Sequence, residues 1–176
     1  MPAPDDSHTE ANKLLVHRHI NEAWNQGRVN NTLLAADVHL HDPVFPNLDP
    51  GARNVRNHIQ ACRRAFPDLT FTIDDTVAER NEVVIHWTAR GTHMGDFLGM
   101  QPTHRPATVT GTSIYRLEGS RIVEEWAHWN LMSMIEQLNV PKAAPPKPVA
   151  SARPRSKADT QAEHKTRPRR ASKTNA

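Results

Sequence analysis

The sequence predicts an α+β domain over residues 1–140, in which helices come first and an antiparallel sheet follows. Apolar residues recur at helical spacing up to Phe66, and from Leu69 onward the period changes to two. Helices that precede a meander of strands pack against one face of the sheet, which must curve around them. The hollow between helices and sheet is therefore the expected pocket.

The first helix is expected to open at Ser7, because Glu10 follows at the spacing of a capping box. Its apolar positions follow at helical spacing: Val16, Ile20, Ala23 and Trp24. Gly27 is the expected stop, since glycine is common just after the last helical turn.

Two more helices are expected before the sheet, with an extended, proline-rich segment between them. A short one is predicted over residues 31–36. The longer one ends at Pro67, and its apolar positions lie at i, i+4, i+7 and i+11: Val55, Ile59, Cys62 and Phe66.

Four segments rich in Val, Ile, Thr and Trp are predicted to be strands: 69–77, 82–92, 107–117 and 121–130. A short hairpin turn is expected between the first two strands, and another between the last two. A last short helix over residues 131–138 is expected to close the domain.

The segment from Pro141 to the last residue differs sharply in composition. It holds ten basic and two acidic residues, a charge of +8, which leaves −5 for residues 1–140 in a chain of +3. It also has six prolines and no aromatic residue, so residues 141–176 are predicted to be a disordered tail. We expect a solvated extension; weak, salt-dependent contact with nucleic acid or an acidic partner is the secondary hypothesis.

Several classes of protein are excluded by what the sequence lacks. The lone Cys62 cannot form an intrachain disulfide. The first residues do not have the pattern of a secretory signal, and no run of about 18 apolar residues predicts a membrane span. A cytoplasmic protein without membrane contact is the expectation.

Five segments together resemble the SnoaL-like polyketide cyclases (ester cyclases) of the nuclear transport factor 2-like superfamily. They are EAWNQGR (22–28), HDP (41–43), RRAFPDLTFTIDD (63–75), ARGTHMGDFLGMQPTHR (89–105) and IVEEWAHWNLMSMIEQL (122–138). The resemblance implies a cone-like α+β barrel, with N-terminal helices packed in a strongly curved antiparallel sheet around an apolar pocket. It also implies a homodimer or higher homo-oligomer and a small apolar or polyketide-like ligand.

The activity that the resemblance implies is an intramolecular aldol condensation that closes a ring of a polyketide ester, without metal or organic cofactor. In the family, the general base is an aspartate four residues after the tryptophan of an E-x-W motif. That position is Asn130 here, counted from Trp126. An amide can hydrogen-bond a carbonyl but has no basic lone pair, so either the base has moved or the domain does not perform this reaction.

Histidine is the obvious substitute base, because its usual pKa suits proton transfer near neutrality. Alternation along the last strand puts Trp126, His128 and Asn130 on one face. If the family's aspartate position faces the pocket, His128 does too. We therefore expect His128 as the base and Asn130 as the oxyanion donor, although a histidine beside an apolar stripe is more commonly a packing residue.

Further substrate-binding candidates share either aromatic character or a place near the expected pocket: Trp126, His93, His86, His41 and Trp24. For each a structural role is the alternative, with His93 fixing its loop and Trp24 in the core. His39 and His41 have an H-x-H spacing, but two ligands fall short of a zinc site, so no metal is expected.

Two other functions stay open. One is a non-catalytic module that binds a small ligand in the same pocket. The other is an isomerase or epoxide hydrolase on the same fold, which needs a buried carboxylate. Asp42, Asp74 and Asp75 are available for this role, but the sequence places none of them in the pocket.

Overall fold

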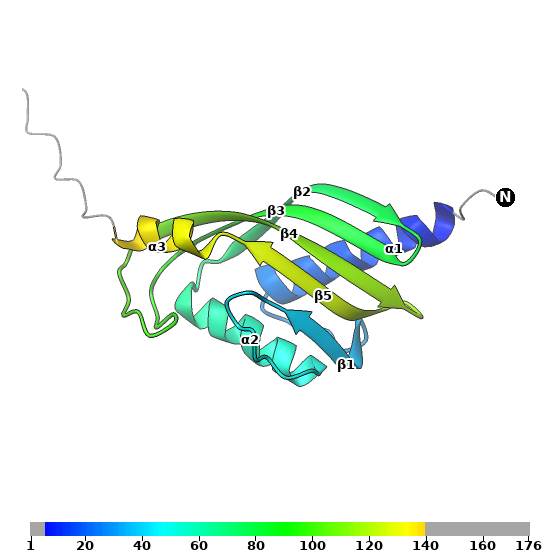
Figure 1. Ribbon diagram of the computed structural model, residues 1–176, viewed down its shortest axis with the longest axis horizontal. Coiled ribbons are helices and arrows are strands. Elements are labelled where there is room, and N and C mark those ends of the chain that lie inside the picture. Colours follow the sequence, from blue (N-terminus) through cyan, green and yellow to red (C-terminus); the bar gives the residue numbers. More distant parts are fainter. Residues whose placement is uncertain (1–5, 140–176) are drawn as a thin grey trace, which may run out of the picture. The chain divides into compact units, whose positions relative to one another are not determined.

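The computed structural model describes residues 6–139 (Figure 1), and the expected tail over 141–176 lies outside the described residues. The elements along the chain are α1 (Asp6–His19), the π-helix η1 (Ile20–Asn25), β1 (Leu34–His41), α2 (Ala52–Ala65), β2 (Thr70–Glu79), β3 (Glu82–Thr92), β4 (Pro106–Glu118), β5 (Arg121–Trp129) and α3 (Leu131–Asn139). The predicted α+β class is confirmed. None of the helices within residues 6–139 has the length and apolar character that a membrane span requires.

The five strands form one sheet in the order β1-β5-β4-β3-β2. From β2 to β5 every neighbouring pair is antiparallel, as the alternating pattern predicts. The expectation of a wholly antiparallel sheet is wrong at one edge, where β1 pairs with β5 in parallel. The sheet is therefore mixed.

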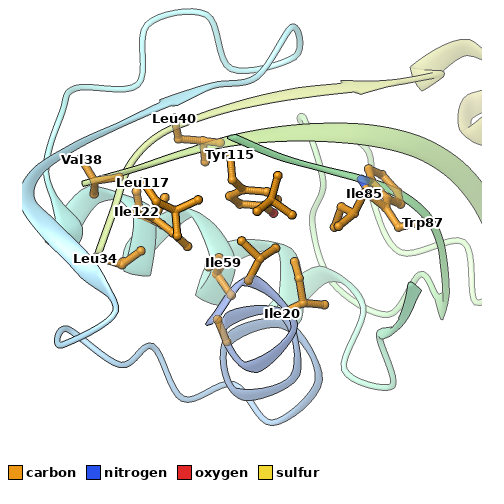
Figure 2. Close-up of a cluster of buried hydrophobic side chains, with 14 of the residues drawn as sticks. Ile20, Leu34, Val38, Leu40, Ile59, Ile85, Trp87, Tyr115, Leu117 and Ile122 are labelled. Atoms are coloured by element: carbon orange, nitrogen blue, oxygen red, sulfur yellow. The ribbon is translucent and has the colours of Figure 1, made fainter. Parts of the chain in front are cut away.

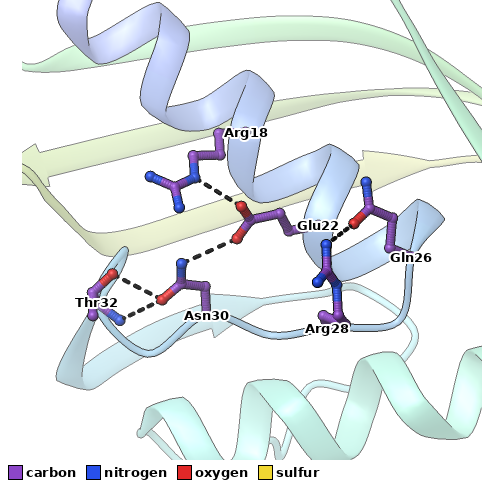
Figure 3. A network of polar contacts seen from close by, with 6 residues as sticks. All are labelled: Arg18, Glu22, Gln26, Arg28, Asn30 and Thr32. Atoms are coloured by element: carbon purple, nitrogen blue, oxygen red, sulfur yellow. Dashed lines mark hydrogen bonds and ion pairs between the residues drawn. The ribbon is translucent and has the colours of Figure 1, made fainter.

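The predicted short helix over residues 31–36 is also wrong, because strand β1 begins at Leu34. A polar network fixes the turn before it (Figure 3): the Asn30 amide donates to Glu22 at 3.1 Å and its oxygen accepts from the Thr32 backbone at 3.0 Å. Pairing with β5 then buries Leu34, Val38 and Leu40. Long-range strand pairing thus overrides the helical propensity of the alanines in this segment.

The main core lies between the sheet and the two longer helices, and its side chains come from both (Figure 2). Val16 and Ile20 from the first helical segment and Val55 and Ile59 from α2 are at most 3% exposed. They pack on strand residues such as Ile85, on the face that we call the inner face of the sheet. A second cluster joins the end of α2 and the loop after β3 to α3.

Gly111 shows how tightly the inner face is packed beside this core. A Cβ at this position would lie 2.4 Å from the Trp87 ring and 2.7 Å from the His128 carbonyl oxygen. Gly111→Ala should therefore lower the free energy of unfolding by about 2 kcal/mol, the usual cost of overpacking. Urea unfolding checks this, with Thr110→Ala at the exposed neighbouring position as the control; equal stability of the two variants would contradict it.

Candidate functional site

An apolar cavity lies between the helices and the inner face of the sheet. Its volume, measured at the centres of water-sized molecules, is about 90 Å³. Eight of the nine aromatic residues of the chain line it: Trp24, Phe45, Phe66, Phe71, Trp87, Phe97, Tyr115 and Trp129. Such a wall favours a flat, largely apolar ligand.

Asp42 brings a carboxyl group into this cavity. It directly follows β1, and only 8% of its surface is exposed. Its Oδ1 accepts a hydrogen bond from the Val44 backbone at 2.8 Å, and its Oδ2 accepts one from the Trp129 indole at 3.3 Å. These two donors hold the carboxylate in place in an otherwise apolar environment.

His58 lies beside Asp42 on the buried face of α2, three residues after Val55. Its Nε2 is 4.0 Å from Asp42 Oδ2, and its ring packs edge-on against Phe45. Burial lowers the pKa of His58, while the neighbouring Asp42 acts in the opposite direction. The imidazole is therefore neutral near pH 7 and can accept a proton.

Glu125 brings a second carboxyl group, from β5. Its Oε1 accepts a hydrogen bond of 2.9 Å from the hydroxyl of Tyr115, which is fully buried on β4. Burial raises the pKa of Glu125 to about 7, because the charged form loses its hydration there. Ser113 also hydrogen-bonds this carboxyl and accepts the Trp87 indole at 3.1 Å.

A bulge in β5 decides which of its side chains enter the cavity. Arg116 on β4 pairs with Glu124 but the next residue, Leu117, pairs with Ile122, so one residue of β5 is left over. The bulge lets both Ile122 and Glu125 face inward. From there on Glu125, Ala127 and Trp129 line the cavity.

Trp126 and His128 consequently lie on the outer face of the sheet, and neither lines the aromatic cavity. They do share one face, as alternation predicts, but this face is not the wall of the aromatic cavity. His128 is exposed. It borders a second hollow together with His39 and His41, and Asp42 and Ala127 line both this hollow and the aromatic cavity.

Asn130 lies between β5 and α3 and caps the helix, where its Oδ1 accepts a hydrogen bond of 2.9 Å from the Ser133 backbone N–H. It is not among the residues that line the cavity. The expected pairing of a His128 base with an Asn130 oxyanion donor therefore does not form within this cavity, since one side chain is outside and the other is engaged in the cap.

The remaining histidine candidates also lie outside the cavity lining, whereas Trp24 is part of it. His41 is exposed, stacks on Trp126 at 5.4 Å and pairs with Glu124 at 2.9 Å. His86 is exposed on the outer face, with its Nδ1 3.6 Å from an Asp74 oxygen. Both side chains thus make their contacts at the outer face of the sheet.

His93 is fully buried, and its hydrogen bonds fix the loop after β3. Its backbone N–H and C=O bond Arg105 and His104, and its Nδ1 lies 3.2 Å from the Thr103 hydroxyl. Its ring stacks on Phe66. This matches the structural alternative for His93.

Within residues 6–139, no group of three or more His, Cys, Asp or Glu side chains is arranged to hold a metal ion. The rings of His39 and His41 share a face, with centroids 6.0 Å apart, and the nearby Glu124 carboxylate is already paired with Arg116 and His41. The polar chemistry available in the cavity is that of two carboxyl groups, an imidazole, hydroxyl groups and the thiol of Cys62. Burial raises the pKa of this thiol to about 12, so it stays protonated near pH 7.

His58, Tyr115 and Glu125 line the cavity, but none of them was predicted as a candidate from the sequence. One signal was present: His58 is a polar residue at i+3 from Val55 on the apolar face of its helix. For Glu125 no local signal existed, because the neighbouring Glu124 has the same chemistry and only the bulge separates the two faces.

Comparison with known proteins agrees with this fold. The family model of the SnoaL-like polyketide cyclases matches residues 14–138. IdmH of Streptomyces antibioticus, which carries a provisional assignment as a polyketide cyclase, is 30% identical over 73% of this chain and 99% of its own, with a TM-score of 0.63. A protein of Acidithiobacillus ferrooxidans with the same provisional assignment is 25% identical over 73% of this chain and 94% of its own (TM-score 0.65).

TsrD of Streptomyces laurentii shares the fold at 24% identity, with 73% of this chain and 96% of its own covered and a TM-score of 0.67. Among curated proteins, none matches the sequence. The match of the family model over most of the chain, together with the likeness to IdmH, establishes the family. The chain belongs to the SnoaL-like polyketide cyclase family.

Proposed function

We propose that the domain binds a small, largely apolar carbonyl compound of the polyketide type and transfers protons on it without a cofactor, in an aldol-type ring closure. His58 is the general base and Asp42 its partner. His58 takes the role of base that the sequence suggested for His128, and Asp42 stabilises its protonated form. The SnoaL-like family and the aromatic cavity support the ligand class, and the Asp42–His58 pair supports the reaction.

The base step follows from the protonation state of His58. Its neutral imidazole accepts a proton from the carbon next to a carbonyl group, and an enolate forms. The imidazolium that results lies 4.0 Å from Asp42 Oδ2, so the carboxylate stabilises the new positive charge. The largely apolar wall lowers the polarity around the pair, which strengthens this interaction.

The observation that carries the proposal is a histidine–carboxylate pair inside an otherwise aromatic cavity. Only 7% of His58 and 8% of Asp42 is exposed. A buried, deprotonated imidazole next to a carboxylate is the arrangement that general-base catalysis needs, and stability alone would favour apolar residues of similar size. The base has thus moved from the end of β5 to α2.

Hydrogen–deuterium exchange tests the base step without knowledge of the natural substrate. The probe is 1-acetonaphthone, a flat ketone whose methyl hydrogens exchange in D₂O once an enolate forms. The wild-type protein should accelerate this exchange, measured by proton NMR. His58→Asn should slow the accelerated exchange by about 100-fold or more, the usual contribution of a general base, and Asp42→Asn by about tenfold.

Two matched substitutions control for the chemical change itself. His17→Asn and Asp37→Asn replace exposed residues, and both should exchange the probe at the wild-type rate. If His58→Asn exchanges the probe at the wild-type rate, His58 is not the base. A probe that binds to the wild-type protein without accelerated exchange would instead favour the non-catalytic binding module.

A second candidate, an isomerase, is favoured by one observation. The cavity contains the buried carboxyl groups that this reaction needs, from Asp42 and Glu125. In an isomerase, the proton taken from one carbon returns to another and no carbon–carbon bond forms. Product analysis with a labelled β,γ-unsaturated ketone separates the two reactions, because only the isomerase moves the double bond.

A further inference from the structure

Glu125 has no part in the base step, yet hydrogen bonds from neighbouring side chains hold its carboxyl group at the wall of the cavity. Glu125 is only 6% exposed, and its carboxyl group accepts a hydrogen bond of 2.9 Å from the Tyr115 hydroxyl. Ser113 adds a second hydrogen bond and is itself fixed by the Trp87 indole at 3.1 Å. Three side chains from two strands therefore orient one carboxyl group at the wall of the cavity (Figure 2 shows Trp87 and Tyr115).

The charges around Glu125 disfavour its ionised form. Asp42, which follows β1, acts against a second negative charge in the cavity. The histidines that face this region, His58 on α2 and His19 packed edge-on against Tyr115, are both held neutral by burial. None of the described lining residues is Lys or Arg. A carboxyl group in such surroundings keeps its proton up to neutral pH and can donate a hydrogen bond.

We propose that Glu125 is the acid of the site: in its neutral form it donates a hydrogen bond, and then its proton, to the carbonyl oxygen of the ligand, with Tyr115 as a positioning residue. The Tyr115 hydroxyl donates to Oε1, so the proposal puts the Glu125 proton on the other oxygen, Oε2. The inference deepens the proposed function and rests on it.

The proposed step balances in protons and electrons. His58 takes the α-proton, and the electron pair of that C–H bond becomes the new carbon–carbon bond. The π pair of the attacked carbonyl takes the Glu125 proton and becomes an O–H bond. His58 ends protonated and Glu125 ionised, and transfer of one proton from the imidazolium to the carboxylate, through water or the product hydroxyl, restores both.

This arrangement narrows the class of ligand. The compound carries one carbonyl whose α-hydrogen reaches His58 and a second carbonyl oxygen that reaches Glu125, so it is a dicarbonyl compound. It is also neutral at the Glu125 end, because an anion there would meet two acidic groups and no Lys or Arg among the described lining residues. A cationic ligand would prefer the ionised carboxyl group instead.

Two isosteric probes test the proposal by calorimetry: 1-acetonaphthone, which has a carbonyl oxygen, and 1-ethylnaphthalene, which has a methylene group in its place. The ratio of their affinities measures the hydrogen bond to the carbonyl. In the wild-type protein this ratio should fall about tenfold from pH 6.0 to pH 8.5. In Glu125→Gln it should be the same at both pH values, since the amide does not titrate.

Tyr115→Phe tests the positioning role. The Tyr115 hydroxyl lowers the pKa of Glu125, because it donates to the ionised form. Without it, the fall in the affinity ratio should remain but its midpoint should move to higher pH. A purely structural role of Tyr115 would weaken both probes equally and leave the midpoint unchanged.

The other outcomes overturn the proposal in distinguishable ways. A wild-type ratio that is constant with pH, or that rises, shows that Glu125 does not act as the neutral donor. A fall that persists in Glu125→Gln assigns the effect to another group. If neither probe binds to the wild-type protein at either pH, the proposed function fails, and this inference fails with it.

Discussion

At pH 8.5, Glu125→Gln should be more stable than the wild-type protein by about 3 kcal/mol, and at pH 5 by less than about 1 kcal/mol. The reason is that the pKa of Glu125 lies at about 7 in the folded protein and near 4.5 in the unfolded chain. Above pH 7 folding must bury a carboxylate, whereas the glutamine of the variant is uncharged at every pH. Urea unfolding at the two pH values measures the difference.

The sign follows from the count of bound protons. Between pH 4.5 and pH 7 the folded protein holds the Glu125 proton and the unfolded chain releases it, so the wild-type protein loses stability as the pH rises. Glu124→Gln is the matched control, one residue away on the outer face. It should show no comparable gain at pH 8.5; an equal gain would mean that burial of Glu125 is not the cause.

His19→Leu should have the opposite pH profile. It should gain about 2 to 3 kcal/mol of stability over the wild-type protein on going from pH 7.5 to pH 4.5. His19 is 1% exposed, its Nδ1 has no hydrogen-bond partner within the described residues, and burial lowers its pKa to about 4. Leucine has a similar volume and takes up no proton, so it removes this acid sensitivity.

In the unfolded chain, His19 titrates near pH 6.5. Below that pH His19 binds a proton in the unfolded chain but stays neutral in the folded protein. The free energy of unfolding of the wild-type protein is therefore unaffected by His19 above pH 6.5 and falls toward pH 4. Urea unfolding at pH 4.5, 6 and 7.5 measures this. His17→Leu, on the exposed side of the same helix, should keep the wild-type profile; the same gain there would refute the assignment to His19.

Periodicity predicted most of the fold, because most elements carry their own pattern. The helix over 52–65 and the four strands from β2 to β5 agree with the prediction within a few residues at their ends. Strand β1 was missed, because within residues 6–139 it pairs only with β5, more than 80 residues away. The alanines at 35 and 36 favour a helix locally, and only the distant pairing reverses that preference.

The site was less predictable than the fold, for a reason that lies in β5. Period-two alternation correctly grouped Trp126 with His128, but which group faces the cavity depends on one extra residue in the strand. A bulge of this kind leaves no mark in the local sequence. Asp42 was recognised as an available carboxylate, whereas its partner His58 comes from a separate helix and meets it only through the tertiary fold.

The aromatic wall of the cavity has a practical consequence for finding the ligand. Of the four tryptophans, Trp24, Trp87 and Trp129 line the cavity and Trp126 lies outside it. Intrinsic fluorescence therefore originates largely at the cavity wall, and a compound that enters the cavity should change the emission directly. Trp126→Phe would confine the signal to the cavity, so that the protein itself becomes an unlabelled sensor with which extracts and compound collections can be screened.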